Sequence, residues 1–107
     1  MHIFSGINIK EVAAGIFWIT KMRETLFIRV FYDRINRNIA VVQPNEPAYD
    51  RIMIDPGRYK FIGTYNHECE PEHIVQDINK LTTELNQGRI PSSLGKHIHV
   101  MRLEDDT

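Results

Sequence analysis

The feature that most constrains this chain is a stripe of apolar residues with helical spacing between Pro71 and Gly88. The stripe consists of Ile74, Val75, Ile78, Leu81 and Leu85. Residues three or four positions apart share one face of a helix. Pro71 suits the first turn, where its missing N–H costs no hydrogen bond, and Gly88 suits a left-handed cap. The pattern predicts one long helix over about residues 71–87, which must cover a sheet or another helix.

Alternating apolar residues predict that strands flank this helix. The order Asp55-Pro56-Gly57 suits a type II turn, because the third position needs a positive φ. That turn predicts a hairpin between the segments on either side of it. The predicted strands are residues 26–32, 39–42, 51–54, 59–62 and 97–103.

The N-terminal region favours a second helix. Asn8 and Glu11 have the spacing of a capping box, so a helix over about residues 9–19 is expected. Gly15 weakens a helix interior, and residues 16–19 have strand propensity. A short helix to Ala14, followed by a strand through Met22, is therefore the alternative.

Together these elements predict an α+β fold. An antiparallel sheet of about five strands would carry the 71–87 helix and the 9–19 helix on one face. A chain of 107 residues is expected to form a single domain over residues 1–107. The single cysteine, Cys69, excludes an intrachain disulfide. The apolar run at residues 12–20 is too short to span a membrane and has no basic leader, so a cytoplasmic protein without membrane contact is expected.

The sheet has more apolar positions than one covered face requires. They are Phe27, Phe31, Met53 and Ile62. A homodimer interface is the simplest way to cover a second face, and packing of loops against it is the alternative.

Five potential metal ligands are grouped in two short segments. They are His67, Cys69, His73, His97 and His99. Zinc binds imidazole and thiolate, but this spacing matches no standard zinc motif, and solvated histidines are the favoured interpretation. Glu68 and Glu70 beside Cys69 disfavour its thiolate, so a nucleophilic cysteine is not expected.

Residues 21–37 combine basic and aromatic side chains, as surfaces that bind single-stranded nucleic acid do. The basic residues are Lys21, Arg23, Arg29, Arg34 and Arg37. The net charge of the whole chain is −1, which makes nucleic acid an unfavoured partner.

No combination of residues typical of a catalytic site is apparent. The leading hypothesis is a small non-enzymatic binding or regulatory module without a cofactor, which binds protein and acts as a homodimer. One alternative is a metal-dependent or small-ligand-binding enzyme that uses the histidines and Cys69 with zinc. The other is weak binding of single-stranded nucleic acid by residues 21–37.

Overall fold

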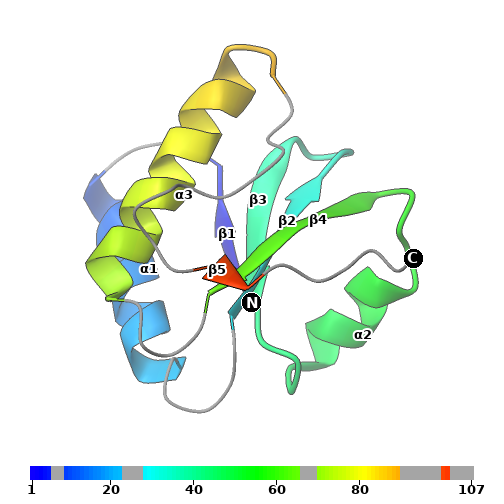
Figure 1. Ribbon diagram of the computed structural model, residues 1–107, viewed down its shortest axis with the longest axis horizontal. Helices are drawn as coiled ribbons and strands as arrows, with labels where there is room; N and C mark the ends of the chain where they lie inside the picture. The colour runs from blue at the N-terminus through cyan, green and yellow to red at the C-terminus, as the bar shows by residue number, and fades with distance from the viewer. Residues whose placement is uncertain (6–8, 23–27, 66–69, 90–99, 102–107) are drawn as a thin grey trace.

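The computed structural model is an antiparallel sheet with helices on both faces (Figure 1). It describes residues 1–5, 9–22, 28–65, 70–89 and 100–101. In chain order the elements are β1 (His2–Phe4), α1 (Ile9–Met22), β2 (Ile28–Asp33), β3 (Asn38–Val42), α2 (Pro47–Met53), β4 (Tyr59–Tyr65), α3 (Pro71–Asn86) and β5 (Val100–Met101). The predicted α+β class is confirmed.

The strands lie in the order β1-β3-β2-β4-β5, and every neighbouring pair is antiparallel. β2 is central, and at its end Asp33 pairs with Asn38 of β3 and with Tyr59 of β4. In the pairing of β2 with β4 the register shifts at Ile62, which leaves this residue as a bulge. The sequence patterns did not reveal β1, and β5 pairs with β4 through two residues of the predicted last strand.

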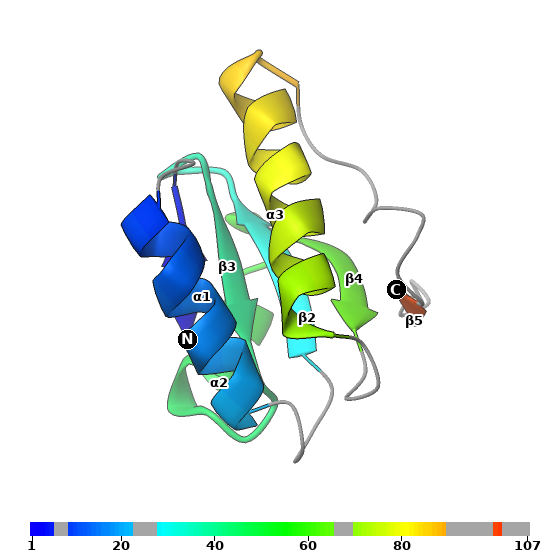
Figure 2. The same ribbon diagram turned by 90° about the vertical axis from the view of Figure 1, so that its left-hand side faces the viewer.

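α1 and α3 cover one face of the sheet (Figure 2). The predicted stripe on α3 is buried, and strand residues such as Val30, Tyr32 and Val41 pack in the same core. Burying each such side chain stabilises the fold by roughly 1.5–3 kcal/mol relative to leaving it in water. The helix predicted from this stripe is therefore confirmed.

α1 is the longer of the two helices considered for the N-terminal region, and the strand through Met22 is wrong. Gly15 is buried at the contact between α1 and β1. A Cβ atom at Gly15 would lie 2.5 Å from Cζ of the buried Phe4 ring. The glycine that weakens the helix therefore allows its close approach to the sheet.

The second face is partly covered by α2, which replaces the strand predicted at residues 51–54. Pro47 begins this helix, and Ala48 and Ile52, four positions apart, are buried against Phe31 and Val42. Four apolar or mixed residues are too few to distinguish a strand from a helix by periodicity. The expected hairpin at 51–62 is wrong for this reason.

The turn at Asp55-Pro56-Gly57 connects α2 to β4 rather than two strands. Gly57 does not adopt a positive φ, so the predicted type II turn is also wrong. Instead, the Asp55 carbonyl accepts hydrogen bonds from the N–H groups of Arg58 and Tyr59, both at 3.1 Å.

Three of the four residues proposed for a homodimer interface are described, and these three do not share one surface. Phe31 is buried beneath α2, and Ile62 is buried beneath α1 and α3. Met53 is exposed at the end of α2, and Phe27 lies outside the described residues. Packing within the chain thus accounts for two of the four positions. Among the residues described, no helix has the length and apolar character needed to cross a membrane.

Candidate functional site

Two loops meet at the end of the sheet where β2 finishes and β4 starts. One is the turn between β2 and β3, and the other connects α2 to β4. The Arg34 N–H donates to the Arg58 carbonyl at 2.8 Å, and Nη1 of Arg34 donates to the carbonyls of Pro56 and Gly57, both at 3.0 Å. We call residues 33–37 and 54–60 together the loop platform.

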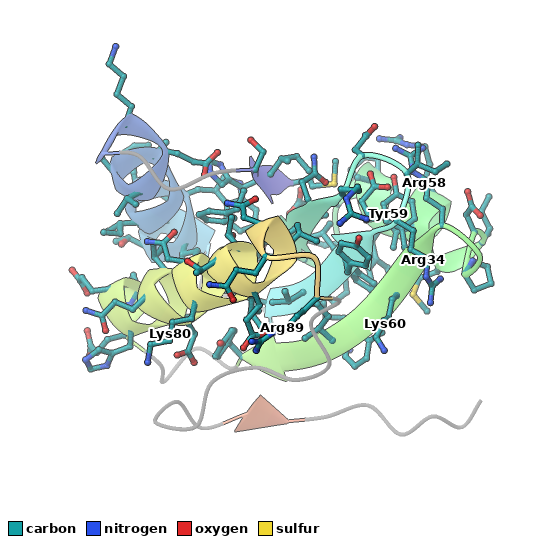
Figure 3. All side chains as sticks on the ribbon, turned by 90° about the horizontal axis from the view of Figure 1, so that it is seen from above. Arg34, Arg58, Tyr59, Lys60, Lys80 and Arg89 are labelled. Carbon is teal, nitrogen blue, oxygen red and sulfur yellow. The ribbon has the colours of Figure 1, made fainter. Side chains whose placement is uncertain are left out.

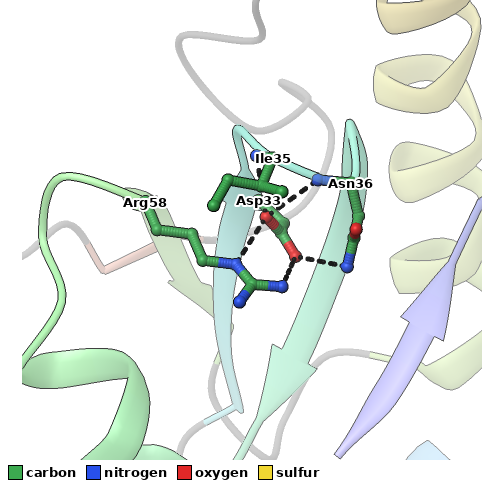
Figure 4. Close-up of polar contacts among 4 residues, drawn as sticks. All are labelled: Asp33, Ile35, Asn36 and Arg58. Carbon is green, nitrogen blue, oxygen red and sulfur yellow. Dashed lines mark hydrogen bonds and ion pairs between the residues drawn. The ribbon is translucent and has the colours of Figure 1, made fainter.

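A single carboxylate organises this platform (Figure 4). Asp33 is only 3% exposed, and Arg58 donates Nε to its Oδ1 at 3.0 Å and Nη2 to its Oδ2 at 2.9 Å. The N–H groups of Ile35 and Asn36 donate to Oδ1 at 3.0 and 3.1 Å, and Nδ2 of Asn36 donates to Oδ2 at 3.2 Å. Five donors therefore fix one carboxylate to its own turn and to the start of β4.

The electrostatics of Asp33 follow from these contacts. Burial alone raises the pKa of Asp33, but the hydrogen bonds from Arg58 and from the backbone of Asn36 and Ile35 outweigh burial and leave the pKa below its ordinary value. The same hydrogen bond raises the pKa of Arg58. Both groups are thus charged at neutral pH, and their pairing supports the platform.

The turn between β2 and β3 closes through Arg37. Its N–H donates to the Asp33 carbonyl at 2.7 Å, and its φ of 56° lies in the left-handed region. Residues other than glycine rarely adopt this conformation, because the Cβ atom crowds the backbone. The contacts of Asp33 hold the turn in this shape.

Basic side chains predominate on the platform. Arg34 and Arg37 are exposed, Arg58 and Lys60 are partly exposed, and only Asp33 and Asp55 carry negative charge there. The platform therefore has a charge of +2 in a chain of net charge −1. Figure 3 shows Arg34, Arg58, Tyr59 and Lys60 around one end of β4, with Arg89 and Lys80 on the side of α3.

Apolar side chains are exposed beside these charges. Ile54 is 81% exposed and Ile35 is 69% exposed, and each lies on one of the two joined loops. Met53, next to Ile54 at the end of α2, is 48% exposed. Large exposed apolar groups next to arginine are typical of surfaces that bind proteins.

Of the basic residues predicted to bind nucleic acid, the four that the structure describes do not form one site. Arg34 and Arg37 belong to the platform, whereas Arg29 is the second residue of β2, and its guanidinium lies 5.3 Å from the centroid of the Tyr49 ring of α2. Lys21 lies 5.3 Å above the ring of Phe17 near the end of α1, and Arg23 falls outside the described part of the chain. In Figure 2 the C-terminal end of α1 lies toward the end of the sheet where β2 begins. The six residues of β2 extend for about 20 Å, so Lys21 and Arg34 are near opposite ends of the sheet.

The platform residues that the sequence patterns did not identify are Arg58, Lys60, Ile35 and Ile54. Arg58 follows Asp33 by twenty-five positions, and only the pairing of β2 with β4 brings the two together. A signal did exist, because an aspartate at the end of one strand and an arginine at the start of another can pair across antiparallel neighbours.

Four of the five residues of the predicted metal site lie outside the described residues. His67, Cys69, His97 and His99 are not among the described residues, and His73 is exposed in the first turn of α3. Within residues 1–5, 9–22, 28–65, 70–89 and 100–101, no three His, Cys, Asp or Glu side chains are grouped to hold a metal ion. Zinc binding by the five residues remains a prediction.

One buried polar pair lies beneath α3. The Tyr65 hydroxyl donates to Oδ2 of Asp77 at 3.0 Å, and neither side chain is exposed to solvent. This contact joins β4 to α3 in the core, where a ligand has no access.

The exposed guanidinium groups make the platform suited to binding anions. It contains no histidine, cysteine, serine or threonine, the residues most often used for proton transfer or nucleophilic attack. Guanidinium groups donate paired hydrogen bonds to carboxylates and phosphates. Comparison of the chain with models of protein families, with curated proteins and with solved structures found no match.

Proposed function

We propose that the protein is a non-enzymatic binding module that holds an acidic segment of a protein partner on the loop platform. The observation that supports this most is the concentration of four basic side chains on the loop platform, in a chain that is slightly acidic overall. Such a local excess attracts anions to one part of the surface.

Arg34 and Arg37 are the residues best suited to contact the partner. Arg34 uses Nη1 to join the loops, while its Nε and Nη2 donate to no described residue. These two nitrogens form the fork that binds a carboxylate with two parallel hydrogen bonds. Arg58 already pairs with Asp33 and contributes mainly by holding the platform.

Charge alone gives weak and salt-dependent binding. Exposed ion pairs contribute about 0.2–1 kcal/mol each, and screening reduces this at physiological salt. A partner with several carboxylates is therefore expected to bind more weakly as salt rises. It should also bind faster than a neutral partner, because opposite charges steer the encounter.

The test is the fluorescence anisotropy of a labelled acidic peptide, with alternating glutamate and glycine, titrated with the full chain at an ionic strength of about 0.1 M. Arg37→Glu and Lys60→Glu should each weaken binding several-fold, because each replaces attraction by repulsion at the platform. Lys21→Glu makes the same change of charge near the end of α1. This charge lies farther from the platform than the Debye length of about 10 Å, so Lys21→Glu should leave the affinity within about twofold of wild type.

Two results would contradict the proposal. One is the absence of binding by the wild-type chain at every salt concentration. The other is an equal loss of binding for Lys21→Glu and Arg37→Glu, which would mean that total charge rather than the platform determines affinity.

The homodimer, the cytoplasmic location and the zinc site remain predictions. Fewer apolar residues need a dimer partner than the sequence suggested, because α2 already covers Phe31. Light scattering at micromolar concentration tests the dimer, and elemental analysis of the purified protein tests zinc.

A further inference from the structure

We infer that the partner segment carries a large aliphatic side chain flanked by carboxylates, and that Ile35 and Ile54 bind this side chain. The inference rests on the proposed function, because it names the kind of acidic segment that the platform selects. Its basis is the exposure of two isoleucines on two separate loops that are joined beside arginine side chains.

The two isoleucines are the most exposed large apolar side chains of the described residues. A single exposed apolar residue is normal on a protein surface. Here the Arg34 side chain joins the turn that carries Ile35 to the loop that begins at Ile54. Ile35 also donates its N–H to Asp33, so the turn that presents it is fixed by the same contacts that fix Arg58.

The platform is already ordered before a partner binds. The backbone of residues 35–37 is held by Asp33, and the backbone of residues 56–58 is held by Arg34. Binding to a preformed surface loses less conformational entropy than binding to loops that must become ordered. Apolar burial against Ile35 and Ile54 would therefore contribute directly to affinity.

Apolar and basic groups have different parts in this arrangement. Exposed ion pairs add little affinity but favour acidic partners and speed their association. Removing aliphatic surface from water supplies most of the affinity. A segment that has both carboxylates and an aliphatic side chain uses both properties of the platform, whereas a purely acidic segment uses one.

The same features favour a protein over single-stranded nucleic acid. Bases stack on exposed aromatic rings, whereas the two exposed apolar side chains of the platform are aliphatic. Tyr59 is the only aromatic residue there, and it is partly buried with the Arg58 guanidinium 4.9 Å from its ring. The ring therefore offers little surface to a base.

The experiment compares two labelled peptides of equal charge and length, one with glutamate and glycine and the other with two glycines replaced by leucine. The wild-type chain should bind the leucine peptide about tenfold more tightly, as expected when one aliphatic side chain is largely buried. Ile35→Ser and Ile54→Ser should each reduce this ratio to about twofold. Both side chains are exposed, so the substitutions should not disturb folding, which thermal melts will check.

Phe17→Ser is the matched control, because Phe17 is an exposed apolar residue on α1 and not on the platform. It should leave the tenfold ratio unchanged. Equal binding of the two peptides by the wild-type chain would overturn this inference while leaving the proposed function intact. Failure of both peptides to bind would overturn both.

Two other occupants of the platform would also overturn the inference. Tighter binding of a single-stranded oligonucleotide than of the leucine peptide in the same buffer would assign the platform to nucleic acid. A wild-type dimer that Ile54→Ser converts to a monomer would assign it to a second copy of the chain.

Discussion

Asp33 is the residue on which the platform depends most. Its carboxylate is nearly inaccessible to solvent and accepts hydrogen bonds from Ile35 and Asn36 of its own turn and from Arg58 of the other loop (Figure 4). A buried carboxylate is unfavourable unless it is paired and hydrogen-bonded, and here both conditions are met. The cost of burial is thereby offset by contacts that also define the shape of the site.

Asp33→Asn should lower the free energy of unfolding by about 2 kcal/mol. The amide cannot form the ion pair with Arg58, and its NH2 group would point at hydrogen-bond donors instead of acceptors. Chemical denaturation at neutral pH measures this loss. Asp55→Asn is the control in the same platform, since this exposed carboxylate makes no side-chain hydrogen bond in the described structure, and it should change stability by less than about 0.5 kcal/mol. An equal effect of the two substitutions would contradict the role given to Asp33.

Acid should weaken the platform in a defined pH range. Because folding lowers the pKa of Asp33 below its ordinary value of 3.8, the folded state binds this proton less readily than the unfolded state. The stability that Asp33 supplies is thus fully present well above pH 3.8, and it is lost as the pH falls from there through the folded pKa. The difference in unfolding free energy between wild type and Asp33→Asn should therefore shrink below pH 3.8. A difference that stays constant over that range would be evidence against the ion pair.

At the scale of elements, the sequence predicted long patterns well and short ones poorly. The stripe on α3 extends over three turns, so helical spacing was unambiguous. The four residues 51–54 were too few, and the contact that decides their conformation, Ala48 and Ile52 against Phe31, joins segments far apart in sequence. β1 has only three residues and no alternation to detect. Tertiary contacts therefore decided the elements that were predicted wrongly or missed.

The close approach of α1 to β1 at Gly15 can be tested by substitution. Gly15→Ala should destabilise the protein by about 1–2 kcal/mol, because overpacking against Phe4 exceeds the gain in helix propensity. Thermal or chemical unfolding measures the change. In a Phe4→Leu background the smaller side chain leaves room for the new methyl group, so Gly15→Ala should cost less or become stabilising. The same cost in both backgrounds would show that close approach to Phe4 is not the reason for this glycine.

At the scale of the whole molecule, the order of the strands in the sheet brings the two loops of the site together. The sequence singled out Arg34 and Arg37, and both belong to the platform. It could not link them to Arg58 and Lys60, because the link depends on β4 pairing with β2 rather than with the segment at residues 51–54. The same misplaced hairpin concealed the loop that presents Ile54. Predicting the site required the register between strands, which composition and periodicity do not supply.

The most direct test of the proposed binding surface is a titration of the isotope-labelled full chain with the leucine-containing acidic peptide, followed by amide chemical shifts. Binding at the loop platform predicts that the largest shifts occur in residues 33–37 and 54–60 and that they diminish as salt is raised. Largest shifts in α1, or no shifts at all with the peptide in excess, would contradict the assignment of the platform as the binding surface.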